Sequence, residues 1–145
     1  MRGVPGELRA VIDTNVIVSA LINAEGVPAA VMRALEEGRF VLVTSRAINA
    51  EILEVVRRPR LQKRYGPTWK ISTLAQMLEK RARVVVDPPP VAFSPDPNDD
   101  KFLSAAVGGK AGYLVTGDIK DLLSLGEYRG VRIVSPRRFL EVLRT

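Results

Sequence analysis

The chain has 145 residues, a hydrophobic fraction of 46% and a formal net charge of +6, which indicates one globular domain with a basic surface suited to a polyanionic partner. It contains no cysteine and no histidine, so disulfides, thiolate or imidazole metal sites and Ser-His-Asp triads are excluded. No apolar run approaches the ~20 residues of a membrane helix and no signal-peptide pattern is visible, so we expect a cytoplasmic protein. We expect one domain over residues 1–145, with residues 1–8 as a flexible extension.

Short apolar runs alternate with helical patterns along the chain. A strand over 9–13 precedes helices over 15–23 and 26–39, and a strand over 40–43 precedes a helix that Thr44 or Ser45 caps and Pro59 ends. The remaining pattern predicts, in chain order, a basic connector, a helix over 67–82, a strand over 83–86, a Pro-rich loop over 87–97, a helix over 98–108, a strand over 113–116, a short helix near 121–125, a strand over 131–134 and a helix capped by Ser135. The strands are apolar without alternation, which predicts an α/β fold with a parallel sheet between helices.

Acidic residues follow four of the predicted strands, and ligands bind beyond the carboxyl ends of strands in such sheets. They are, in chain order, Asp13, Glu51, the group Asp96, Asp99 and Asp100, and Asp118. Taken alone, each has an ordinary interpretation as a helix cap, a first-turn charge, a turn residue or a solvent-facing position. Asp13 is harder to explain in this way, because a carboxylate at the end of a buried strand needs a partner. A divalent cation such as Mg²⁺ or Mn²⁺ is an economical partner for the whole group.

The segment 57–70 is basic and contains no acidic residue. It combines two rings, Tyr65 and Trp69, with Arg57, Arg58, Arg60, Lys63 and Arg64. This mixture suits a strand of RNA, since cations contact phosphates and rings stack on bases. The alternative is a solvated connector with Trp69 packed in the core.

Four stretches carry a resemblance to a known family. In their order and spacing, VIDTNVIVSAL, SRAINAEILEVVRRPRL, DPNDDKFLSAA and YLVTGDIKDLL resemble the PIN domain and, more narrowly, the VapC-like PIN-domain toxins of toxin–antitoxin systems. The resemblance implies a three-layer fold with a mostly parallel central sheet of four to five strands flanked by helices. It also implies an Mg²⁺- or Mn²⁺-dependent endoribonuclease that acts on RNA, has a cognate antitoxin and forms a homodimer.

The resemblance also assigns site residues. It implies that the catalytic and metal-binding acids are Asp13, Glu51, Asp99 and Asp118, with Asn15 and Thr116 in support. Relatives often read Asp-Pro-Asp-Asp-Asn where this chain has Asn98 and Asp100, so Asp96 and Asp100 stay open as further metal ligands. Two alternatives to a ribonuclease also stay open: a catalytically silent RNA-binding PIN domain and a receiver-like signalling domain that binds Mg²⁺.

Overall fold

Strands and helices alternate as the sequence predicts, in a computed structural model that describes residues 7–65, 71–92, 97–117 and 125–144. The strands are β1 (Arg9–Ile12), β2 (Val41–Ser45), β3 (Arg83–Val85), β4 (Tyr113–Val115), β5 (Glu127–Tyr128) and β6 (Val131–Val134). The helices are α1 (Thr14–Ile22), α2 (Val27–Glu36), α3 (Arg46–Val56), α4 (Pro59–Gln62), α5 (Ile71–Gln76), the π-helical turn η1 (Met77–Arg81), α6 (Pro97–Gly108) and α8 (Pro136–Leu143).

The described strands form one sheet in the order β3-β2-β1-β4-β6-β5, and among them only β5 runs antiparallel to its neighbour. β1 is central, with Ala10 opposite Leu42 of β2 and Tyr113 of β4. The predicted α/β class with a mostly parallel sheet is confirmed, but the described part of the chain forms six strands instead of four to five. The additional strand is β5, which turns into β6 through Arg129 and Gly130, both at positive φ, as a two-residue hairpin turn requires.

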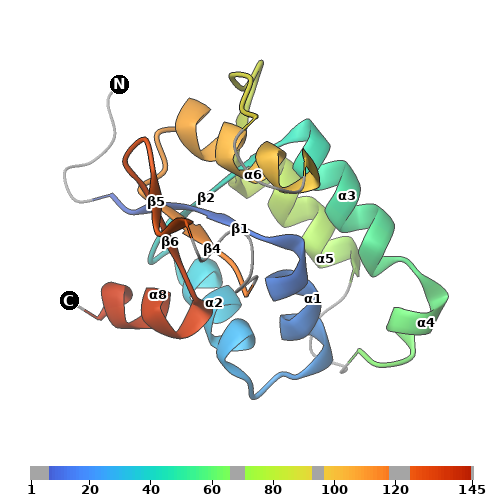
Figure 1. Cartoon of the computed structure of the whole chain (residues 1–145). Coiled ribbons are helices and arrows are strands. Elements are labelled where there is room, and N and C mark those ends of the chain that lie inside the picture. The colour runs from blue at the N-terminus through green and yellow to red at the C-terminus, as the bar shows by residue number, and fades with distance from the viewer. Residues whose placement is uncertain (1–6, 66–70, 93–96, 118–124, 145) are drawn as a thin grey trace.

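Helices cover the sheet from both sides. α6 packs against β1, β2, β4 and β6, whereas α2 and α8 contact each other on the opposite side (Figure 1). α3 contacts α1 and α6, which places three helices beside the carboxyl end of β1. None of the described helices is long and apolar enough by itself to cross a membrane; α1 and α2 meet that test only together, with a 100° bend between them.

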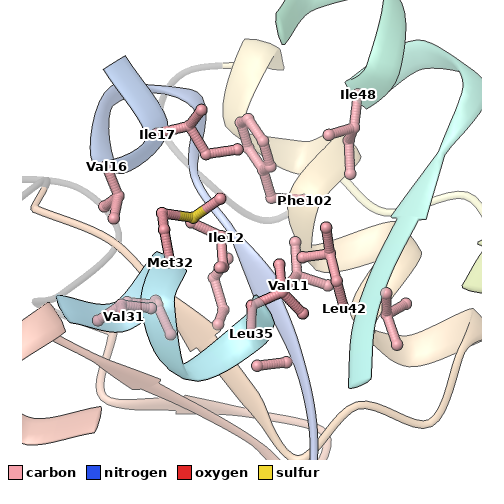
Figure 2. Close-up of a cluster of buried hydrophobic side chains, with 14 of the residues drawn as sticks. Val11, Ile12, Val16, Ile17, Val31, Met32, Leu35, Leu42, Ile48 and Phe102 are labelled. Atoms are coloured by element: carbon pink, nitrogen blue, oxygen red, sulfur yellow. The ribbon is translucent and has the colours of Figure 1, made fainter. Parts of the chain in front are cut away.

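The core is built around β1, whose residues from Ala10 to Ile12 are buried. Side chains from four helices converge on this strand, among them Ile17, Met32, Ile48 and Phe102 (Figure 2). Full burial of a side chain of this size contributes about 1.5–3 kcal/mol, so the strand that carries the first predicted acid is firmly fixed.

Two local predictions about helix starts are confirmed. Ser45 caps α3 by accepting a hydrogen bond from Ile48 N at 3.3 Å, and Ser135 caps α8 by accepting one from Arg138 N at 3.1 Å. The predicted basic connector contains the short helix α4, and the helix predicted over 67–82 is described from Ile71 as α5 and η1.

Some expectations fall partly or wholly on residues that the structure does not describe. The N-terminal extension expected over 1–8 is described only at its end, where Leu8 packs against the core and its carbonyl accepts from Val41 N at 2.8 Å. The short helix predicted near 121–125 lies almost entirely outside the described residues.

Candidate active site

Asp13 lies at the junction between β1 and α1. It follows the last strand residue and caps α1, with Oδ1 accepting from Asn15 N at 3.4 Å. Its other carboxylate oxygen, Oδ2, accepts from the Thr116 hydroxyl at 2.7 Å, and its backbone N donates to Val115 O at 2.9 Å. The carboxylate is therefore buried and held between the carboxyl ends of β1 and β4.

Glu51 reaches the same region from α3. The cap at Ser45 fixes where this helix begins, and the spacing of Glu51, Val55 and Arg58 places all three along one pocket. Glu51 Oε2 accepts a hydrogen bond from the Thr14 hydroxyl, and Oε1 lies 2.7 Å from Lys101 Nζ. Both carboxylate oxygens are thus bound by donors from other elements.

The first turn of α6 supplies the third wall. Asn98 and Asp99 line the pocket, together with Phe102 one turn further on. A helix N-terminus favours negative charge, because its unpaired N–H groups and the helix dipole are positive there. Asp100 is also in this turn and is half-buried, but it does not line the pocket.

The pocket has a volume of about 220 Å³ and brings together three of the predicted acids, Asp13, Glu51 and Asp99. Their carboxylate oxygens are the donor type that Mg²⁺ and Mn²⁺ prefer. Among the described residues, however, no three acidic side chains are grouped closely enough to hold one metal ion. The donor chemistry therefore fits a hard divalent cation, while the described carboxylates alone do not form a finished coordination site.

Of the remaining predicted site residues, some lie at the pocket and some fall outside the described part of the chain. Asn15 lines the pocket and Thr116 donates to Asp13, and their supporting role stays a prediction. Asp96 and Asp118 lie outside the described residues.

The predicted RNA-binding cations all lie on the surface. Arg57, Arg58, Arg60, Lys63 and Arg64 are exposed. Arg58 also lines the pocket, and its guanidinium pairs with Glu54, outside the pocket, at 2.9 Å. The Tyr65 ring packs against the protein and is not presented to solvent for stacking on a base. It is half-buried against the core and its hydroxyl donates to Val56 O at 2.9 Å, and burial raises the pKa of this hydroxyl above its usual value. Trp69 lies outside the described residues.

Sequence reasoning missed two residues that contact Glu51. Thr14 directly follows Asp13, and Lys101 directly follows Asp100. No sequence pattern indicates that either residue contacts Glu51, because they lie 37 and 50 positions from it along the chain. They meet it only through the packing of α1, α3 and α6.

Comparisons with known proteins agree with this architecture. The family model described as PIN domain matches residues 9–120. The uncharacterized protein MJ1680 of Methanocaldococcus jannaschii is 30% identical over 143 residues, which cover 93% of this chain and 91% of that protein. The crystal structure of VapBC2 from Rickettsia felis bound to a DNA fragment from their promoter is similar in fold, with a TM-score of 0.53 and 16% identity, over 88% of this chain and 98% of that one.

Proposed function

Because the chain belongs to the PIN-domain family, whose members are generally nucleases, we propose that it is an Mg²⁺- or Mn²⁺-dependent endoribonuclease. The observation that carries this proposal is the pocket that Asp13, Glu51 and Asp99 line from three different elements. A receiver-like signalling domain is excluded by the family assignment.

We assign the carboxylates of this pocket to holding the metal, with Asp118 as the fourth acid. A bound Mg²⁺ or Mn²⁺ would lower the pKa of a water molecule and offset negative charge on the phosphate. Thr116 fixes the Asp13 carboxylate, and Thr14 fixes the Glu51 carboxylate. Glu51 is then oriented either to bind the metal or to align the attacking water. Water activated in this way would cleave the phosphodiester without a side-chain nucleophile, in keeping with a chain that has neither cysteine nor histidine.

We assign the exposed cations after α3 to binding the RNA backbone. Arg58 lies at the pocket itself. Arg57 caps the end of α3, and Arg60, Lys63 and Arg64 follow along α4 and the turn after it. Phosphates bound along this surface lead one phosphodiester to the acidic pocket, because Arg58, at the start of α4, lines the same pocket as the carboxylates of Asp13, Glu51 and Asp99.

We further propose that the protein is the toxin of a toxin–antitoxin pair in the cytoplasm, that it is held inactive by a cognate antitoxin, and that it forms a homodimer. The support is the likeness of its fold to the solved VapBC2 complex. Co-expression with the product of a neighbouring gene tests this part: the pair should co-purify, and growth arrest by the protein alone should be relieved.

The cleavage activity is tested with fluorescently labelled single-stranded and structured RNA, with Mg²⁺ or Mn²⁺ and with EDTA. The wild-type protein should cut only with metal, and Glu51→Gln should lose roughly 10²-fold or more in rate. Glu54→Gln is the matched control, since it makes the same change one turn away, where the side chain is 62% exposed and outside the pocket. Binding of RNA without any cleavage by the wild-type protein would show a catalytically silent domain and refute the proposal.

A further inference from the structure

The side chain of Lys101 is held against residues of the candidate site and is largely shielded from solvent. Its Nζ lies 2.7 Å from Glu51 Oε1, 2.6 Å from the Asn98 carbonyl oxygen and 4.9 Å from the centre of the Phe102 ring. Its side chain is only 20% exposed. Glu51, Asn98 and Phe102 all line the pocket, so the ammonium is bound by three groups of its wall.

This ion pair differs from the other one beside the pocket. The Arg58–Glu54 pair has side chains 53% and 62% exposed, whereas those of the Lys101–Glu51 pair are 20% and 30% exposed. Solvent weakens an exposed pair strongly and a partly buried pair less. With Thr14 bound to the other oxygen, the Glu51 carboxylate has a protein donor on each side.

We propose that Lys101 is a positioning residue that acts as a built-in counter-ion of the pocket: its ammonium occupies Glu51 Oε1 in the metal-free protein and competes with a divalent cation for that oxygen. This inference rests on the proposed function, because it requires that the pocket binds a metal. It assigns to Lys101 two effects, which are holding Glu51 in place without metal and lowering the affinity for metal.

The physical basis is a competition between cations. A carboxylate oxygen has two lone-pair sites, but an ammonium and a dication that share one oxygen repel each other, so each raises the cost of bringing the other near. Removing a unit charge about 6 Å from a dication, at the dielectric constant of water, corresponds to roughly tenfold tighter metal binding. We therefore expect Lys101→Met to bind Mn²⁺ about tenfold more tightly than the wild-type protein.

The affinity is measured by calorimetric titration of Mn²⁺ into the full chain without RNA. Lys101→Gln is a second neutral variant that keeps a hydrogen-bond donor for Glu51. It provides the same test if Lys101→Met does not fold. Lys101→Arg keeps the charge and should bind Mn²⁺ like the wild-type protein. Lys110→Met is the matched control, because it removes the same charge from an exposed residue that lines a different pocket, and its affinity should not change.

Melting curves separate this role from a purely structural one. If Lys101 is a counter-ion, the metal-free Lys101→Met protein melts lower than the wild type, and Mn²⁺ raises its melting temperature by more. In the Glu51→Gln background the gain in affinity from Lys101→Met should shrink, because the oxygen under competition has lost its charge. A purely structural role would lower the melting temperature equally with and without Mn²⁺ and leave the affinity unchanged.

The outcomes for this inference and for the proposed function are distinct. No Mn²⁺ binding by the wild-type protein would overturn the metal-dependent function and the counter-ion role together. Binding of equal strength by the wild type and both neutral variants would overturn the counter-ion role alone.

Discussion

Replacing Thr116 by valine tests how the structure holds its most buried carboxylate. Thr116 is fully buried and donates to Asp13 Oδ2 at 2.7 Å, and Asp13 is only 5% exposed. Valine keeps the shape and removes the donor, so one oxygen of a buried charge loses this partner. A hydrogen bond to a charged group contributes about 1.5–3 kcal/mol, and we expect Thr116→Val to lower the free energy of unfolding by about that amount.

The measurement is urea denaturation with EDTA present, supported by thermal melting. At about 2–4 °C per kcal/mol for a chain of this size, the melting temperature should fall by roughly 3–12 °C. Thr44→Val is the matched control. Thr44 is also buried at the end of a strand, but it donates to the neutral Asn49 Oδ1 at 2.6 Å, so its loss should be nearer 1 kcal/mol. If Thr116→Val costs no more than Thr44→Val, the reasoning that the hydroxyl serves an ionised Asp13 is refuted.

Three further predictions concern charge and packing. Asp99→Asn should melt a few degrees higher than the wild type without metal, because it relieves about 1 kcal/mol of repulsion among the pocket acids, and it should gain less from Mn²⁺; an unchanged response to Mn²⁺ would contradict this. Reversing the charges of the exposed Arg57, Arg58 and Arg60 should weaken binding to all single-stranded RNA alike. It should also reduce the slope of log affinity against log salt concentration by roughly 2, and an unchanged slope would show that these residues do not contact the RNA. Gly109→Ala should lose about 1–3 kcal/mol by overpacking, because its Cβ would lie 2.5 Å from Val43 Cγ1, whereas Gly112→Ala meets nothing within 4 Å and should leave urea denaturation unchanged.

The fold could be predicted from sequence because local signals and burial agreed. The unalternating strands, the caps at Ser45 and Ser135, and the family resemblance all indicated a parallel α/β sheet, and the structure and the family match confirm it. β5 could not be predicted, because two residues carry no period and the turn at Arg129 and Gly130 has no Asn-Gly or Asp-Gly pair.

The candidate site was predictable only in part, for a physical reason. Asp13, Glu51 and Asp99 each follow a strand, so topology alone indicates that they share an edge of the sheet. Whether another residue reaches that edge depends on how two helices pack. Lys101 contacts Glu51 only because α6 lies beside α3, and a single sequence gives no measure of how closely two helices approach.

The double contact of Asp13 separates what folding needs from what the proposed chemistry needs. Folding uses Asp13 as a cap and as a partner of Thr116, and asparagine caps a helix about as well as aspartate. The hydroxyl of Thr116 can also accept from an amide, since it is both donor and acceptor. The Asp13→Asn protein should therefore keep its architecture and lose this charge, so that the proposed metal chemistry is one conservative substitution away from loss, with no rebuilding of the fold.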